Sequence, residues 1–424
     1  MTNVADASLE VLDMPASRAT VRPHDPPAAD RLLVVLSDVE MGAGGHQDDF
    51  PHSDWLGELI LSYNQPPYTE LPVELVLNGD IFDLLKTSYL DAYPRHISPD
   101  VTLGKMSRIA AAHPRFFEAM RAFLGHTGAE RRAVFVTGNH DAELVFPELQ
   151  LLVRSLCGHA DQIQFAGFRH VVGSVHIEHG SQLDPLFAVE EDRPIVDFEG
   201  QRLLNISWGA GALLDTVMMW QPIFGFHERL LPRDQVFELL PEFKELLTGT
   251  FWRYWTRDYW KGYFGSKDPT RKLGWSMAKE LASRFGSKSI NVHLGSALVQ
   301  KLREGDDIRL VVLGHKHEAG WWTYGDRKLL QAGCFRNEFM MSEGGKNLRP
   351  CPKTYVEVYI QDGHPVHSQL VEVQGPPAPE GYVPVSIFDV LPRVQELLAA
   401  QQIQSEDKKA WRAQEKKEKA EASS

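Results

Sequence analysis

The stretch Leu75-Val76-Leu77-Asn78-Gly79-Asp80-Ile81-Phe82-Asp83 joins a short apolar run to two carboxylates. The run from Leu75 to Leu77 predicts a buried strand, and Gly79 predicts a turn at its end. Carboxylates at the end of a buried strand lose hydration, which is unfavourable unless a cation pairs with them. The stretch therefore predicts that Asp80 or Asp83 lies at a cation site.

Four other stretches repeat this pattern of an apolar run followed by side chains that can bind a metal ion. They contain Asp38 and Glu40; Asn139, His140 and Asp141; His179; and His315 and His317. Strands that alternate with helices predict an α/β fold with a layered sheet. In such folds the site lies at the carboxyl ends of the strands. Five such clusters in one chain indicate a metal site built from distant segments.

Charge and cysteine content restrict the class of protein. A formal net charge of −13 over 424 residues argues against broad attraction to nucleic acid or anionic lipid. Cys157, Cys334 and Cys351 are widely spaced and lack CxxC spacing, so we expect reduced thiols and no zinc cluster of thiolates. No secretory signal is expected, and the longest apolar run, residues 206–219, is broken by Asp215. We expect a cytoplasmic protein.

Hydrophobic periodicity predicts the main elements. Strands are expected over residues 31–36, 133–136, 308–313, 328–331 and 355–360, with a hairpin over 169–172 and 174–178. Helices are expected over residues 54–61 with Ser53 as N-cap, 105–124 with a break at His113-Pro114, and 143–157. Further helices are expected over residues 237–247, 276–285, 292–303 and within 385–403.

These elements predict one catalytic domain with additions. Residues 1–29 are expected to form a flexible arm and residues 30–375 the domain, which contains a helical, aromatic-rich insertion at about 185–305. Residues 376–403 form an extension with a short helix, and residues 404–424 a charged tail. The aromatic run over residues 251–260 is interpreted either as a lid over an apolar substrate or as packing of the insertion or a dimer contact.

The chemistry of the candidate ligands favours hard or borderline divalent ions. Carboxylate, amide and imidazole donors suit Mn, Fe, Zn or Mg. Seven donors are too many for one tetrahedral zinc and fit two ions that share Asp80 as a bridge. The donors are Asp38, Glu40, Asp80, Asn139, His179, His315 and His317.

The order of these motifs resembles that of the calcineurin-like metallophosphoesterases. The motifs are Asp38-Val-Glu40, Gly79-Asp80-Ile-Phe-Asp83, Gly138-Asn139-His140-Asp141, His179-Gly180 and Gly314-His315-Lys-His317. The resemblance implies a four-layer metallophosphoesterase β-sandwich flanked by helices. It also implies a site with two divalent metal ions, Mn being favoured, that hydrolyses phosphate esters.

The resemblance also implies roles for individual residues. Asp38 and His317 would hold the first ion, Asp80 would bridge, and Asn139, His179 and His315 would hold the second. A hydroxide between the ions would attack phosphorus. His140 would be the catalytic histidine, held by Asp141 or Asp83, and Asp83 is interpreted as a support and not as a ligand.

One position departs from the family pattern, which has histidine where this chain has Glu40. Glutamate can ligate through oxygen and would then favour Mn or Mg over Zn at the first position. Alternatively Glu40 points away and the first position is weak, which would make the protein mononuclear or poorly active. His46 in the following loop is a candidate substitute ligand.

The leading hypothesis is a metal-dependent phosphoesterase that cleaves a phosphomonoester, phosphodiester or pyrophosphate. The alternatives are a catalytically impaired scaffold on the same fold, suggested by Glu40, and a Mn-dependent nuclease, which the acidic charge disfavours. Gly333-Cys-Phe-Arg336 is interpreted as a structural turn in which Arg336 is a candidate phosphate contact. The sequence identifies neither a substrate-binding residue nor the oligomeric state.

Overall fold

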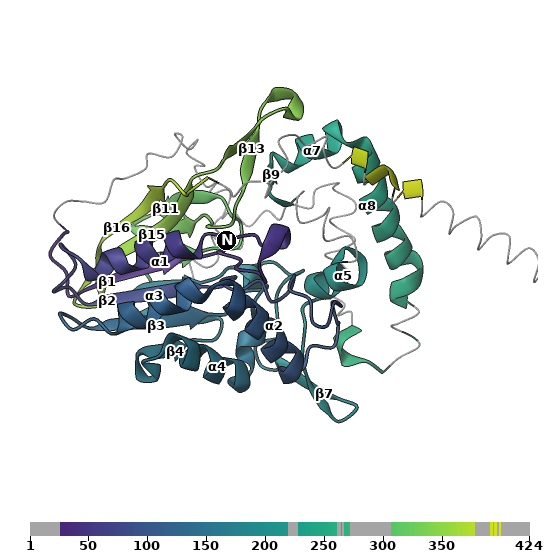
Figure 1. Cartoon of the computed structure of the whole chain (residues 1–424). Helices are drawn as coiled ribbons and strands as arrows, with labels where there is room; N and C mark the ends of the chain where they lie inside the picture. The colour runs from purple at the N-terminus through teal and green to yellow at the C-terminus, as the bar shows by residue number, and fades with distance from the viewer. Residues whose placement is uncertain are drawn as a thin grey trace, which may run out of the picture.

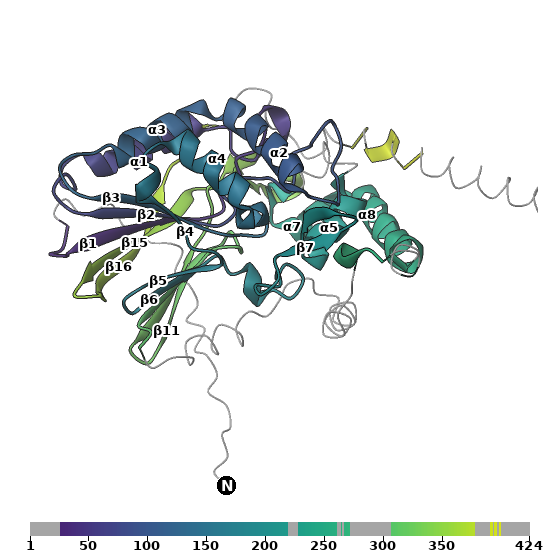
Figure 2. The ribbon, with the colours of Figure 1, turned by 90° about the horizontal axis from the view of Figure 1, so that it is seen from below.

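Two β-sheets pack face to face in the computed structural model, with helices over the outer face of one of them (Figures 1 and 2). The structure describes residues 26–218, 228–260, 264, 267–271, 307–377, 391–392, 394–396 and 398–399. The predictions for the N-terminal arm up to residue 25, the helices over 276–285 and 292–303, and the charged tail lie outside these residues.

The first sheet has six strands in the order β16-β15-β1-β2-β3-β4. Strands β1 (Arg31–Leu36), β2 (Val73–Asn78), β3 (Arg131–Val136) and β4 (Ile163–Phe165) are parallel. The antiparallel pair β15 (Lys353–Gln361) and β16 (His364–Val373) completes the edge beside β1. The predictions for β1, β2, β3 and β15 are confirmed to within a few residues at each end.

The second sheet has five strands in the order β11-β12-β10-β6-β5. They are β11 (Ala319–Tyr324), β12 (Arg327–Ala332), β10 (Leu310–Leu313), β6 (Val175–Glu178) and β5 (Arg169–Val172). The predicted hairpin of β5 and β6 is confirmed, and β6, β10 and β12 run parallel.

Alternating side chains of the strands build two separate cores. On β1, Leu33 and Val35 face the second sheet and pack with residues such as Val312. Leu32 and Val34 face the helices. A parallel strand that is covered on both faces reads as a continuous apolar run, which is the pattern that predicted β1.

Helices α1 (Ser53–Leu61), α2 (Pro99–Ala112), α3 (Pro114–Leu124) and α4 (Pro147–Cys157) cover the outer face of the first sheet (Figure 2). The predicted break at His113-Pro114 is confirmed. The helix predicted over 143–157 is instead a short turn, η3 (Ala142–Val145), followed by α4. Proline begins α4 because its missing N–H is not needed at the first helical position. Ser53 is the first residue of α1 and not its N-cap, a position that His52 occupies.

The described part of the insertion is mixed rather than purely helical. It contains the hairpin β7 (Ile195–Phe198) and β8 (Gln201–Leu204), and the helices α5 (Trp208–Thr216), α7 (Arg233–Leu239) and α8 (Pro241–Arg253), followed by a π-helical turn, Tyr254–Asp258. The residues predicted as helical over 237–247 are helical except Leu240, where Pro241 separates α7 from α8.

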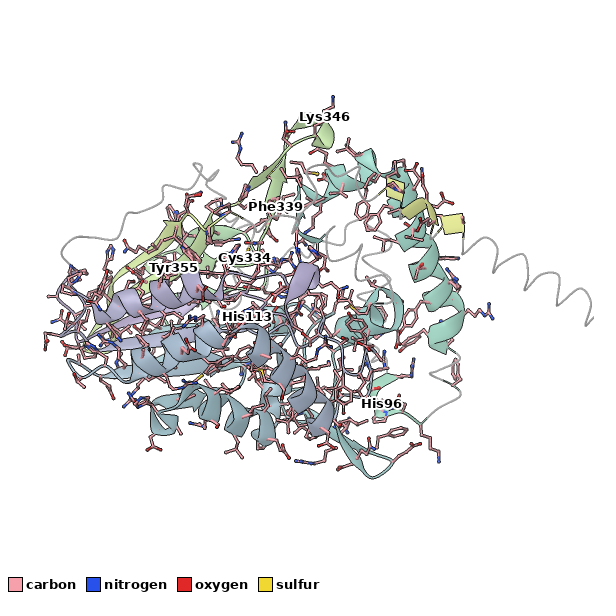
Figure 3. All side chains as sticks on the ribbon, in the orientation of Figure 1. His96, His113, Cys334, Phe339, Lys346 and Tyr355 are labelled. Atoms are coloured by element: carbon pink, nitrogen blue, oxygen red, sulfur yellow. The ribbon has the colours of Figure 1, made fainter. Side chains whose placement is uncertain are left out.

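Among the described residues, the contacts that attach this insertion to the rest of the chain include a strand pairing, an apolar contact and a polar contact. Strand β9 (Leu230–Leu231) pairs with β13 (Phe339–Met341), which pairs with β14 (Leu348–Pro350). The side chain of Val394 from the C-terminal extension is buried against α7 and α8. His96 lies beside the insertion (Figure 3), where its Nε2 is 2.8 Å from Asp268. Within the described residues, no helix is long and apolar enough to cross a membrane.

The sandwich with parallel central strands and flanking helices confirms the predicted α/β class. It brings the ends of β1, β2, β3, β6 and β10 to one side of the molecule, where the five sequence motifs meet.

Candidate active site

The candidate ligands follow the strands on sharply bent backbone. Asp38 and Asp80, after β1 and β2, have φ angles of 53° each, and His315 and His317, after β10, have φ angles of 71° and 59°. Left-handed backbone is unfavourable for these residue types and is found mostly where function requires it. The strand ends therefore hold these side chains in fixed positions at some conformational cost.

Two glycines in the motifs allow the loops to approach each other. A Cβ atom on Gly138 would lie 2.2 Å from Oδ1 of Asp80, and one on Gly79 would lie 2.6 Å from the ring of His179. Both distances are far below van der Waals contact. Glycine before Asp80 and before Asn139 is therefore required by the site and not only by the turn.

The first donor set consists of Asp80, Asn139, His179 and His315. Nε2 of His179 lies 3.1 Å from Oδ2 of Asp80 and 3.2 Å from Oδ1 of Asn139. One ligand atom each from Asp80, His179 and His315 lie within 4.8 Å of one another. Ligand atoms around one transition-metal ion have such separations, since each lies about 2 Å from the ion.

The contacts of His179 favour a positive charge in this set, either a metal ion or a second proton on the ring. Its Nδ1 is 3.0 Å from the carbonyl oxygen of Asn78, so Nδ1 carries a hydrogen and donates it there. In the neutral ring, the lone pair of Nε2 then faces oxygen lone pairs of Asp80 and Asn139, which is repulsive. Without a metal ion the ring must take up a second proton. Burial lowers the pKa of His179, but the charges of Asp80 and Asp38 outweigh burial and raise the pKa to about 10. The four residues fit a divalent ion.

The second donor set consists of Asp38, Glu40 and His317. Nε2 of His317 lies 3.3 Å from Oδ1 of Asp38 and 3.4 Å from Oε1 of Glu40. Nδ1 of His317 lies 3.0 Å from Glu338. The side-chain donors converge here too, but the surroundings differ from those of the first set.

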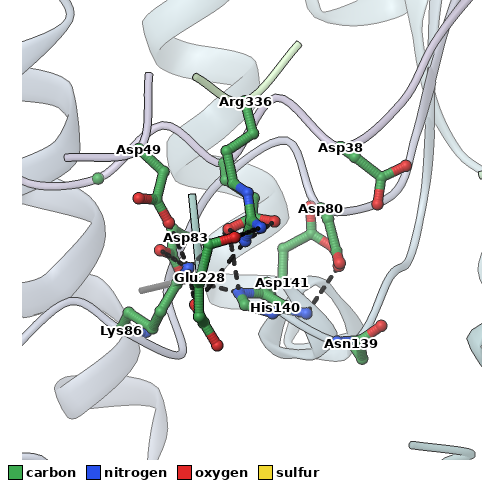
Figure 4. A network of polar contacts seen from close by, with 12 residues as sticks. Asp38, Asp49, Asp80, Asp83, Lys86, Asn139, His140, Asp141, Glu228 and Arg336 are labelled. Atoms are coloured by element: carbon green, nitrogen blue, oxygen red, sulfur yellow. Dashed lines mark hydrogen bonds and ion pairs between the residues drawn. The ribbon is translucent and has the colours of Figure 1, made fainter. Parts of the chain in front are cut away.

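Glu40 in the second set is already paired with two permanent cations, Lys86 and Arg336, whose side chains Figure 4 shows. Nζ of Lys86 lies 2.7 Å from its Oε2, and Nη1 of Arg336 lies 3.2 Å from its Oε1. Burial raises the pKa of Glu40, but the charges of Arg336 and Lys86 overcome this and hold the pKa well below its ordinary value. Glu40 therefore does not point away from the site, yet it also is not a free ligand. His46 is exposed in a short turn, η1 (Gly45–Gln47), and has no contact with Glu40 within the described residues.

His140 lies between the two donor sets, with its ring held by Asp83. Its Nδ1 is 2.9 Å from Oδ1 of Asp83, and its backbone N–H donates to Oδ1 of Asp80 at 2.7 Å. Burial lowers the pKa of His140, but Glu40, Asp80 and Asp83 outweigh it and raise the pKa to about 10. The ring is therefore a proton donor at neutral pH when no metal is bound.

Asp141 has a different environment from that proposed in the sequence analysis. Its Oδ2 accepts from the backbone N–H of Ile81 at 2.8 Å, and its Oδ1 accepts from that of Gly138 at 2.8 Å. No bond joins it to the His140 ring among the residues described. Of the two candidate partners for the histidine, Asp83 makes the contact, and Asp141 ties together the loops after β2 and β3.

Sequence reasoning missed the ionic residues around the second donor set. Lys86 contacts Glu40, Asp49, Asp83 and Glu228, and Arg229 donates to Asp49 at 2.5 Å. No local pattern marks these residues, because charged side chains in loops are ordinarily solvated.

Sequence reasoning also set aside every cysteine as unsuitably placed. Cys334 is buried beside His317 and Glu338, and their three ligand atoms lie within 4.8 Å of one another. Burial raises the pKa of its thiol well above the ordinary value, so the thiol is protonated.

Several solved structures are similar to this chain. A dimetal phosphatase from Danio rerio is 10% identical, with a TM-score of 0.31, over 82% of this chain and 100% of that one. The sulfate thiohydrolase SoxB of Thermus thermophilus is 14% identical, with a TM-score of 0.30, over 90% and 62%. A predicted phosphoesterase from Streptococcus pneumoniae is 10% identical, with a TM-score of 0.23, over 81% and 97%.

No protein-family model and no curated protein matches the sequence. Because the TM-scores of the similar structures are below 0.5, the likeness carries no argument about what this chain does. The chemistry has to be argued from the site itself.

Proposed function

We propose that this protein is a metal-dependent phosphoesterase that hydrolyses a phosphomonoester, phosphodiester or pyrophosphate. The observation that carries the proposal is the first donor set, in which the lone pair of His179 faces the oxygens of Asp80 and Asn139. A protonated imidazole, His140, lies directly beside that set. A cation site next to a held proton donor is what hydrolysis of a phosphate ester requires.

A divalent ion bound by Asp80, Asn139, His179 and His315 would supply a Lewis acid and lower the pKa of a bound water. The oxygen donors in both sets favour Mn²⁺ among the candidate ions. The ring of His140 donates through Nδ1 to Asp83, which leaves its Nε2 without a partner among the described residues. This Nε2–H would donate to a phosphoryl oxygen or protonate the leaving oxygen. Asp83 would keep the ring oriented through both events.

The insertion, taken as residues 185–305 of a domain spanning 30–375, is proposed to form one wall of the substrate site. Support comes from Glu228, whose Oε2 lies 3.2 Å from Nζ of Lys86. Lys86 in turn contacts Glu40 and Asp83. The insertion thus reaches the residues next to the donor sets, so its side chains are in a position to influence which ester is accepted.

A panel of substrates tests the proposal. Aryl phosphates, a bis-aryl phosphodiester, nucleotides, cyclic nucleotides and nucleotide-sugar lipids are incubated with the purified chain and Mn²⁺. We expect hydrolysis of at least one class, lost in Asp80→Ala and in His140→Ala. If both variants kept full activity, or if no ester were cleaved with Mn²⁺, Fe²⁺, Zn²⁺ or Mg²⁺, the proposal would be wrong. Cleavage of DNA alone would favour a nuclease.

A further inference from the structure

We propose that only the first donor set binds a divalent ion tightly, and that Lys86 and Arg336 provide the positive charge at the second set. The inference rests on the proposed function, since it concerns the metal content of the same site. Two ions bound with similar affinity are not expected, because permanent cations contact the second donor set and not the first.

The first set contains no permanent cation. Among the described residues, the carboxylate of Asp80 contacts the ring of His179 and the backbone N–H of His140, and no lysine or arginine. A ligand histidine binds a metal ion as the neutral ring, so His179 brings no fixed positive charge into the set. A buried carboxylate without a permanent counter-charge is unfavourable, and a bound metal ion relieves this cost.

The second set contains two permanent cations in contact with one of its ligands. The carboxylate of Glu40 is 0% exposed and touches Lys86 through Oε2 and Arg336 through both oxygens, at 2.7 Å and at 3.2 and 3.3 Å. A metal ion bound to Glu40 would lie close to both cations in the protein interior, where charges are weakly screened and repel strongly. The repulsion lowers the affinity of this set.

Movement of Lys86 away from Glu40 would leave other buried carboxylates without a counter-charge. Its Nζ also contacts Asp49, Asp83 and Glu228, and its side chain is only 5% exposed. Removing a cation from buried carboxylates is strongly unfavourable. The ammonium group is thus fixed in place by residues that are not metal ligands.

Arg336 is fixed in the same way. Its Nη2 donates to Glu338 at 2.9 Å and to the backbone carbonyl of Glu228 at 2.7 Å. Its side chain is 3% exposed. The two cations of the second set are therefore permanent parts of the protein, unlike a metal ion, whose presence depends on its concentration.

The test is metal content. The full chain is saturated with Mn²⁺, passed through metal-free buffer and analysed by inductively coupled plasma mass spectrometry, with electron paramagnetic resonance as a second readout. We expect one Mn²⁺ per chain and the signal of an isolated ion, without the coupling of a Mn pair. A second ion should bind at least about tenfold more weakly in calorimetric titration, the size of effect that contacts to a metal ligand commonly have.

Variants separate the two donor sets. Asp80→Ala should lose the tight ion, whereas Asp38→Ala should keep it. The double variant Glu40→His/Lys86→Met, which removes the ammonium and supplies an imidazole, should bind a second ion at least about tenfold more tightly than the wild type does. Lys105→Met is the matched control, because Lys105 is an equally buried lysine that pairs with Glu143 instead, and it should keep one ion.

The metal content distinguishes failure of this inference from failure of the proposed function. Two tight ions in the wild type, or loss of the tight ion in a folded Asp38→Ala variant, would overturn this inference and leave the phosphoesterase proposal standing. No tight ion in a folded wild-type chain would overturn both. If the double variant does not fold, as judged by circular dichroism, the Asp38→Ala comparison still decides.

Discussion

Replacing His140 by alanine should reduce turnover by an amount that depends on the leaving group. The ring lies beside Asp80, and its Nδ1 is held by Asp83 at 2.9 Å, which leaves Nε2–H free to donate. If that hydrogen protonates the departing oxygen, an ester with a basic alkoxide leaving group depends on His140. An ester that releases nitrophenolate, which is stable without protonation, depends on it much less.

The expected size follows from general acid catalysis and from the held geometry. A positioned general acid contributes about 10²–10⁴-fold, or about 3 to 5 kcal/mol of activation free energy. We therefore expect kcat to fall about 10³-fold for an alkyl phosphate ester and by at most about 10²-fold for the nitrophenyl ester. Asp83→Asn keeps the ring but replaces a charge-assisted bond worth about 1.5 to 3 kcal/mol, so its loss should be about 10- to 100-fold.

The assay is kcat for matched alkyl and nitrophenyl esters across the three proteins, with metal content measured for each. His126→Gln is the control, because His126 bonds the backbone carbonyl oxygen of Thr69, which belongs to neither donor set. Equal losses for both esters, with the metal retained, would refute the role as acid and leave only a role in binding the phosphoryl oxygens.

Three further predictions concern metal and stability. Asp80→Ala should lower Mn²⁺ content to background together with activity, because its Oδ2 lies 3.1 Å from His179. Burial raises the pKa of Asp48, but the bond and charge of His113 together with the backbone N–H groups of Gly42 and Phe50 outweigh burial and lower that pKa. The folded pKa is thus below the unfolded value of about 3.9, so this stabilisation is complete above about pH 5 and lost as pH falls. Urea unfolding of Asp48→Asn should show lower stability than wild type at pH 7 and a smaller difference near pH 3. Arg131→Met should lower the free energy of unfolding, measured in urea, by at least about 3 kcal/mol, because the buried guanidinium donates to the backbone carbonyls of Tyr63 and Tyr68. The side chain of Arg132 is half-exposed, so Arg132→Met should lower it by less than about 1 kcal/mol.

The central strands and their ligand motifs were predictable because each motif is local. In every case an apolar run and the polar side chain after it are adjacent in sequence, as in β2 and Asp80. The parallel topology then brings the ends of distant strands together without further information. The fold class and the expected donors therefore follow from short stretches taken one at a time.

The electrostatic surroundings of the second donor set were not predictable in this way. Lys86 is 46 residues from Glu40 and Arg336 is 296 residues from it, and neither lies on a periodic element. Their proximity depends on how loops pack, for which propensity gives no signal. The sequence showed that Glu40 is unusual at this position, but only the structure shows that Glu40 is paired with Lys86 and Arg336.

The same ionic contacts join the insertion to the catalytic side of the fold. Arg229, at the start of the described second part of the insertion, is 1% exposed and bonds both the side chain of Asp49 and the backbone carbonyl of Asp48. Asp48 in turn accepts from the backbone N–H groups of Gly42 and Gly44, in the loop that follows Glu40. A shift of the insertion at Arg229 would therefore move Asp49, one of the carboxylates that hold Lys86 against Glu40. The insertion is consequently part of the structure that sets the charge at the second donor set, and not only a wall for substrate.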